Sequence, residues 1–300
     1  MALRSIAVLL SMLSAMGIAF IFYYFTTLDV PGKRFYHFLI KRLAISNLLI
    51  ALSGPYPGLS STPESHIMNI LAFIKSYGIL GSMFWTGLLT YAVVYSLKKQ
   101  STNDQLFKLK CTYMIIGDML PAIFAVLPIF LGHYGRNFQV LFWLNIIPGN
   151  STSLALLLIN LVIPWAIVIF FSIYAYILTS KYLNKYAINN KRREILSFFL
   201  FPGITFFCYT GVIYACFAAY AGKEDNEWID AWAVIPIQIQ GFLNSLSFCA
   251  SKIIRGHFKE RVAPPPKVIR PSASSSITES FLDPEEQDHP KSPIKSHLFI

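Results

Sequence analysis

The sequence predicts an all-α membrane protein, namely a seven-transmembrane helix bundle followed by a short amphipathic helix and a disordered C-terminal tail. Hydrophobic residues make up 55% of its 300 residues and charged residues only 13%. A water-soluble fold of this composition would expose more apolar surface than its polar side chains could cover. The apolar residues also fall into runs long enough to cross a bilayer, and clusters of basic residues separate alternate runs.

The predicted spans account for most of the chain, because each crossing by an α-helix takes about 20 apolar residues. To within several residues, the runs lie at about 5–27, 36–58, 67–97, 111–132, 153–180, 195–221 and 231–251. They would make residues 1–252 one transmembrane domain and leave no room for a separate globular domain. The first run follows Arg4 and lacks a small-residue cleavage site, which favours a retained span over a signal peptide.

The basic residues predict the orientation of these spans. They follow the first, third, fifth and seventh runs, at Lys33, Arg34, Lys41, Arg42, Lys98, Lys99, Lys108, Lys110, Lys181, Lys185, Lys191, Arg192, Arg193, Lys252, Arg255, Lys259 and Arg261. The alternate loops hold only Arg136 and Lys223. Since basic loops stay in the cytosol, we expect a multi-pass plasma-membrane protein with an extracellular N-terminus and a cytosolic C-terminus. The sequon at Asn150 then lies outside, which makes Asn150 a predicted glycosylation site.

Residues 252–263 and 264–300 are expected to lie inside the cell. The first segment could place Ile253, Ile254 and Phe258 against lipid and its bases against headgroups, as an amphipathic helix does. Three prolines then stop the helix, and the rest is rich in Ser, Pro and acidic residues, which predicts disorder. Its SASSSITES stretch has the composition of a kinase target.

The net charge of +10 does not indicate a nucleic-acid partner, because the bases form short clusters rather than a continuous stripe. The lipid bilayer is the expected partner of the apolar runs. The four cysteines lie inside these runs or at their cytosolic ends, so we expect no extracellular disulfide.

Lys75 and Asp118 are the two charges expected well inside spans, where a charge costs about 3 kcal/mol unless it faces water or a partner. Lys75 would lie in the outer half of the bundle and could bind an anionic ligand. Alternatively, its long side chain could extend so that the ammonium group reaches the membrane–water interface. Trp143 and Trp232, near the outer mouth, are the predicted walls of the ligand pocket, with membrane-interface anchoring or core packing as the alternatives. A salt bridge between Lys75 and Asp118 is not expected, because Asp118 lies nearer the cytosol.

Asn47 and Asn244 are amides inside apolar runs and therefore need hydrogen-bond partners on facing helices or water. They could hold helices together or switch between two arrangements.

Four segments resemble the cyclic-AMP-receptor-like group of seven-helix G-protein-coupled receptors, relatives of the slime-mould chemoattractant receptors. They are RLAISNLL (42–49), MFWTGLLTYAVVYSL (83–97), LPAIFAVLPIFLGHYG (120–135) and IQGFLNSLSF (239–248). The resemblance implies a cell-surface receptor that transmits an extracellular ligand signal to a heterotrimeric G protein, without a cofactor. The G protein would contact basic residues at the cytosolic ends of helices, although membrane topology alone could explain those bases. These residues are Lys98, Lys99, Lys191, Arg192 and Arg193.

The chain also departs from the pattern of this group. Phe142-Trp143 stands where the group has a Cys-Trp pair, and no cysteine begins the third span, so the usual disulfide clamp is missing. Of the positions that act as conformational switches in this group, some are changed in this chain and one is retained. Asn47 replaces an Asp, Asp118 replaces a Trp and Phe248 replaces a Tyr, whereas Asn244 is retained.

Other functions of seven-helix proteins fit less well. A retinal protein needs a lysine in the middle of the seventh span, and the first lysine there is Lys252 at its cytosolic end. A membrane zinc hydrolase needs converging ligands, whereas His37, His66, His133 and His257 lie at span ends or in loops. We therefore expect no enzyme, no catalytic residue and no metal. A small-solute transporter or a non-signalling seven-helix protein remains the alternative.

Overall fold

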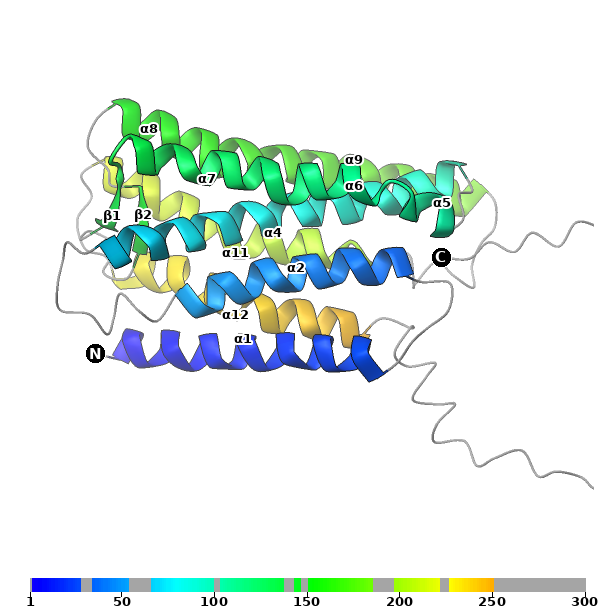
Figure 1. The fold of residues 1–300 in the computed structure, drawn as a ribbon, viewed down its shortest axis with the longest axis horizontal. Helices are drawn as coiled ribbons and strands as arrows, with labels where there is room; N and C mark the ends of the chain where they lie inside the picture. The colour runs from blue at the N-terminus through cyan, green and yellow to red at the C-terminus, as the bar shows by residue number, and fades with distance from the viewer. Residues whose placement is uncertain are drawn as a thin grey trace, which may run out of the picture.

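The computed structural model describes residues 2–27, 34–53, 66–99, 103–137, 143–146, 151–185, 197–221 and 227–250. These residues are almost all helical, and the long helices lie side by side along one axis (Figure 1). Six helices in this part of the chain are long and apolar enough to cross a membrane. The prediction of a helical membrane protein is therefore confirmed.

The helices follow the predicted apolar runs closely. In chain order they are α1 (Ala2–Thr27), α2 (Arg34–Ser53), α4 (His66–Lys99), α5 (Asn103–Phe107), α6 (Lys110–Met114), η1 (Ile115–Met119), α7 (Leu120–Phe130), α8 (Ser151–Leu157), η2 (Leu158–Val162), α9 (Ile163–Lys185), α11 (Leu200–Tyr220) and α12 (Glu227–Ala250). Three consecutive elements, α6, η1 and α7, make the fourth candidate span, and α8, η2 and α9 make the fifth.

The predicted seventh span, 231–251, coincides with α12 but is not among the six candidate spans. Its buried face carries Gln238, Gln240 and Asn244, which lower its hydropathy. α12 nevertheless packs along both α1 and α11. The seventh helix therefore belongs to the bundle although it is not one of the six candidate spans.

The helices form one closed bundle around α4. α1 contacts α2 and α12, and α11 joins α12 to α9, so the first and last helices are neighbours. α4 contacts α2, α7, α9 and α11. In its most apolar stretch 72% of the residues are buried, against 28% for the span Lys110–Phe130. α4 is thus the central helix of the bundle, and the span containing α7 lies at its periphery.

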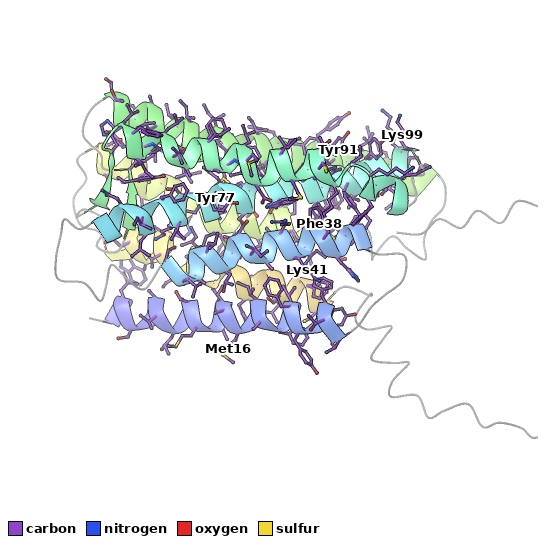
Figure 2. The ribbon with its side chains drawn as sticks, viewed as in Figure 1. Met16, Phe38, Lys41, Tyr77, Tyr91 and Lys99 are labelled. Atoms are coloured by element: carbon purple, nitrogen blue, oxygen red, sulfur yellow. The ribbon has the colours of Figure 1, made fainter. Side chains whose placement is uncertain are left out.

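The outer surface of the bundle is apolar, as a membrane protein requires. Figure 2 shows Met16 of α1 pointing away from the other helices, where it is largely exposed. Phe130, Phe170 and Phe207 are exposed in the same way on three other helices. In water such a surface would be unfavourable, whereas lipid chains cover it without cost.

α11 and α12 approach closely because of a glycine and a proline. Pro236 cannot donate to the carbonyl four residues earlier, which belongs to Trp232. That carbonyl lies against Gly211 of α11, where any Cβ would collide with it. The pair shows how a small residue brings two spans into backbone contact.

A short antiparallel hairpin was not predicted by the all-α interpretation. Strand β1 (Tyr134–Asn137) pairs with β2 (Trp143–Ile146), with Tyr134 opposite Ile146. The hairpin lies at the end of the bundle where α1 begins (Figure 1). The Tyr134 hydroxyl donates to the Ala125 carbonyl at 2.8 Å, and Tyr134 and Ile146 pack on Ala72 of α4. The hairpin therefore covers one end of the central helix.

Two π-helical segments, η1 and η2, were also not predicted. Each inserts a wider turn into an otherwise α-helical span, and such turns are frequent at functional sites. η1 contains Asp118, the predicted charge of the fourth span.

Several predictions lie outside the described residues and are not tested. They are the amphipathic helix 252–263, the tail 264–300, Asn150, Lys191, Arg192 and Arg193.

Candidate functional site

A chain of buried polar side chains links three helices in the interior of the bundle. Near the middle of α4, the Ser82 hydroxyl donates to Oδ1 of Asn47 on α2 at 3.1 Å. Gln240 of α12 donates through Nε2 to the same Ser82 oxygen at 3.0 Å. All three residues are buried. Asn47, a predicted core polar residue, is therefore bound to α4, and through Ser82 it is connected to α12.

Asn244 and Phe248, the other predicted switch positions on α12, are both buried. Asn244 lies one helical turn beyond Gln240, and its amide nitrogen and oxygen have no hydrogen-bond partner among the described residues. Phe248 packs its ring against Tyr24 and Phe25 of α1, at centroid distances of 5.2 and 5.1 Å. Asn244 thus faces the polar interior, whereas Phe248 is part of the apolar contact between α1 and α12.

A second cluster joins α2, α4 and η1 around Asp118. One carboxylate oxygen forms an ion pair with Nη1 of Arg42 at 3.2 Å, and the other accepts a hydrogen bond from Nε1 of Trp85 at 3.1 Å. Gly117, the residue before Asp118, lies under the Trp85 ring, where a Cβ would come within 2.5 Å of ring carbons. The absence of a side chain at Gly117 thus lets the indole approach the carboxylate.

This arrangement corrects one part of the sequence interpretation. Lys41 and Arg42 were counted among the bases of a cytosolic loop, but both lie within α2. The Arg42 guanidinium lies 5.6 Å from the Phe38 ring, and Phe38 in turn meets Trp85 edge-on. Figure 2 shows Phe38 and Lys41 on this helix. Arg42 is therefore a base within a candidate span, paired with Asp118, a role that charge counting did not reveal.

Lys75 is enclosed in the bundle, since only 1% of it is exposed. Its side chain does not reach the surface of the described part of the chain. The alternative interpretation, in which the Lys75 side chain extends to the membrane interface, would require it to do so. Asp230, near the start of α12, is a second buried ionisable residue that the sequence analysis missed, because it precedes the predicted run by one residue. The described helices therefore hold a buried base in the first part of α4 and a buried acid near the start of α12.

The two predicted pocket tryptophans have different surroundings. Trp232 is 42% exposed and packs against Tyr214 of α11, with ring centroids 5.8 Å apart. Trp143 is the first residue of β2, opposite Asn137, but its side chain is not among those the structure describes. These observations place both residues toward the end of the bundle where α12 begins, without bringing Trp232 into the buried setting of Lys75.

The predicted basic contacts at the other end of the bundle are described only in part. Lys98 and Lys99 are the last residues of α4, and both are exposed. The Lys99 ammonium lies 5.9 Å from the Tyr95 ring centroid. Their exposure leaves these two bases accessible to a partner.

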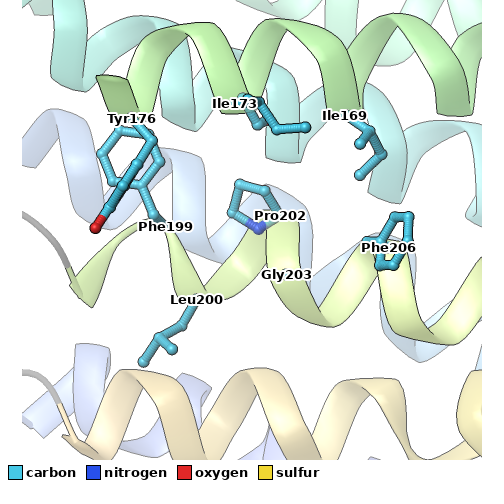
Figure 3. Close-up of a pocket in the computed structure, with 9 residues that line it drawn as sticks. Ile169, Ile173, Tyr176, Phe199, Leu200, Pro202, Gly203 and Phe206 are labelled. Atoms are coloured by element: carbon cyan, nitrogen blue, oxygen red, sulfur yellow. The ribbon is translucent and has the colours of Figure 1, made fainter. Parts of the chain in front are cut away.

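Two grooves on the described part of the bundle are apolar. The first, of about 500 Å³, lies between α9 and α11 and is lined by residues such as Ile173, Tyr176 and Phe206 (Figure 3). The second, of about 460 Å³, lies between α4, η1, α7, η2 and α9, with Phe84 and Phe171 among its walls. Neither is lined by Lys75 or Trp232. Their chemistry suits hydrocarbon rather than a charged ligand.

No model of a known protein family matches this chain, and no curated protein matches it significantly. Within the described residues, no group of three His, Cys, Asp or Glu side chains is placed to hold a metal ion. The functional argument therefore depends on the bundle and on its buried polar residues.

Proposed function

We propose that the protein is a cell-surface G-protein-coupled receptor of the cyclic-AMP-receptor-like type, which transmits an extracellular ligand signal to a heterotrimeric G protein. In this proposal all seven helices cross the plasma membrane, with the N-terminus outside. Residues 252–263 form an amphipathic helix on the inner leaflet, and the tail from residue 264 is disordered in the cytosol.

The observation that supports this proposal best is the arrangement of the helices. α1 and α12 are neighbours, α4 lies at the centre, and polar side chains connect α2, α4 and α12 through the interior. Buried polar contacts between spans can be exchanged without unfolding any helix. A bundle built in this way can adopt two packings, and a ligand that prefers one of them shifts the equilibrium.

The proposed ligand site is in the outer half of the bundle and includes Lys75, Trp143 and Trp232. A buried ammonium binds an anionic group strongly, because little water competes for it. An anionic extracellular ligand is therefore the proposed class. Asn47, Asp118, Asn244 and Phe248 are the proposed core and switch positions between this site and the cytosol.

The proposed G-protein surface is the cytosolic end of the bundle. Lys98 and Lys99 end α4 there, and Lys191, Arg192 and Arg193 belong to the loop that follows α9. Basic side chains at this end would meet acidic groups of the partner.

The experiment is G-protein activation by a panel of anionic ligands in cells expressing the full chain, with solute uptake measured in the same cells. Ligand-dependent activation supports the receptor. Uptake without activation would instead favour the alternative, a small-solute transporter, and neither response across the panel would favour a non-signalling seven-helix protein.

Lys75→Met tests the proposed ligand site directly. The variant keeps the length of the side chain but removes its charge, so surface expression should persist while the agonist concentration for half-maximal response rises about tenfold or more. Tenfold corresponds to about 1.4 kcal/mol, within the range for a hydrogen bond to a charged group. Lys108→Met, which removes an exposed base, is the matched control and should respond normally. A normal dose response for Lys75→Met would remove Lys75 from the ligand site.

A further inference from the structure

We propose that the interior of the bundle between α2, α4, α11 and α12 is a hydration site that holds bound water molecules. The proposal concerns a binding site for solvent and does not depend on the receptor function, because a transporter built on this bundle would bind water at the same atoms.

The first observation is a group of buried polar atoms that lack a hydrogen-bond partner among the described residues. They are Nδ2 of Asn47, Oε1 of Gln240, both Nδ2 and Oδ1 of Asn244, and the hydroxyl of Tyr209. All four residues are at least 98% buried. A native interior rarely leaves so many polar atoms unpaired in one place, since each loses its hydrogen bond to water on burial.

The second observation is that these atoms share one region. Asn47 and Gln240 are joined through the Ser82 hydroxyl. Asn244 follows Gln240 by four residues, so both side chains lie on the same face of α12. The Tyr209 hydroxyl of α11 faces Ser82 and Gln240, although it has hydrogen-bonding geometry to neither. The unpaired atoms therefore converge from three helices onto the Ser82 contact.

The chemistry of the group favours water over an ion. The two asparagine nitrogens are donors, the two amide oxygens are acceptors, and the tyrosine hydroxyl can be either. A water molecule both donates and accepts and can satisfy such a mixed set, whereas a metal cation needs oxygen ligands and usually a carboxylate. The buried acid of α12, Asp230, lies ten residues before Gln240, which is about 15 Å along the helix. Asp118 of η1 is already engaged by Arg42 and Trp85. Five unpaired atoms, at about three bonds per buried water, would be satisfied by about two waters.

The location gives this water a mechanical role. Gln240 and Asn244 lie about one and about two turns after Pro236, at which the helical hydrogen-bond ladder of α12 is interrupted. Hydrogen bonds made through water can re-form after a small displacement of one helix, whereas direct amide contacts require a fixed register. The hydration site would therefore let the inner part of α12 move against α2 and α4.

The first test is hydroxyl-radical footprinting of the purified full-length protein in lipid nanodiscs, in which X-rays generate radicals from water and modify adjacent side chains. Tyr209 is buried with an unpaired hydroxyl, whereas Tyr36 is buried with its hydroxyl bonded to Ser96 at 3.0 Å. Bound water predicts that Tyr209 is modified several times faster than Tyr36. Equal protection of the two tyrosines would overturn the proposal.

The second test uses Asn244→Leu, which replaces the amide by an apolar group of similar size. If water is bound, it loses a partner and the melting temperature falls. If the site is dry, the variant removes two unpaired polar atoms and the melting temperature rises, which contradicts the proposal. Exchanging sodium for choline in the buffer should leave the melting temperature of the unmodified protein unchanged, whereas a drop would show that the site binds a cation instead.

Discussion

The ion pair between Arg42 and Asp118 should contribute measurably to stability, because it joins α2 to η1 through two partly buried side chains. The two side chains are 31% and 14% exposed, and their charged atoms are 3.2 Å apart. At an effective dielectric constant of about 20, this separation corresponds to about 5 kcal/mol of attraction, most of which is offset by desolvation. Exposed pairs contribute up to about 1 kcal/mol, and breaking fully buried ones costs about 3–5 kcal/mol. Because this pair is partly buried, we expect it to contribute an intermediate value of about 2 kcal/mol to the free energy of unfolding.

Asp118→Asn removes the charge and retains an oxygen that can still accept the hydrogen bond from Trp85. We expect its apparent melting temperature in detergent to fall by about 4 °C, at about 2 °C per kcal/mol for a chain of this size. Arg42→Gln should cost a similar amount, because it leaves the carboxylate without its cation. The double variant should lose less than the sum of the two, with a coupling of about 1–2 kcal/mol.

Lys41→Gln is the matched control, since it removes the neighbouring base on the same helix. Its ammonium lies 5.3 Å from the Phe25 ring centroid, an interaction of about 0.5–1 kcal/mol, so the melting temperature should fall by less than about 2 °C. Strict additivity of Asp118→Asn and Arg42→Gln would refute the claim that the two side chains act as a pair.

Three further predictions concern packing, thiols and topology. Gly211→Ala should lower the melting temperature strongly or abolish folding, because its Cβ would collide with the Trp232 carbonyl. Gly203→Ala on the same helix meets nothing and should be tolerated. Equal melting temperatures of the two variants in thermal denaturation would contradict the close contact between α11 and α12. Reducing agent should leave the melting temperature of the purified protein almost unchanged, since the four thiols are free; a marked drop would show a disulfide. Tags at the C-terminus and in the 182–192 loop should be labelled only after permeabilisation, and labelling on intact cells would show that the orientation is the reverse of the predicted one. Asn150 should be glycosylated in a eukaryotic host, which gel mobility before and after deglycosylation would show.

The helices were predictable from the sequence because long apolar runs have few alternatives in a membrane. The bilayer core forces the backbone to satisfy its own hydrogen bonds, so an apolar run of sufficient length becomes a helix whatever its neighbours are. For this reason the predicted run 5–27 and the helix Ala2–Thr27 end at the same residue. α12 was also predictable in position, although its polar face keeps it from standing out by hydropathy.

The polar contacts were less predictable, because they depend on which helix faces which. Asn47 and Asn244 stood out as amides in apolar runs, but Ser82 is a small hydroxyl of a type common in spans, and only its position between Asn47 and Gln240 makes it important. Arg42 was assigned to a loop by its membership of a basic cluster. Its partner Asp118 lies on a helix distant in the sequence, so the pair becomes visible only in three dimensions.

The hairpin was missed for a different reason. Its strands are four residues each, and alternation over so short a length carries little information. It forms because the ends of α7 and α8 bring Tyr134 and Ile146 against α4, which is a tertiary effect.

The π-turn at η1 has a consequence for how this chain can be aligned with other seven-helix proteins. A π-turn accommodates one more residue than an α-turn, so residues beyond Met119 face directions that an uninterrupted helical wheel would assign to their neighbours. An alignment to a protein whose fourth span is a plain α-helix must therefore open a one-residue gap between Ile115 and Met119 if both ends are to keep their faces. A deletion of one residue in that window is a natural way to convert one form of the helix into the other, whereas the same deletion in the α-helical centre of α4 would rotate half of the central helix out of register.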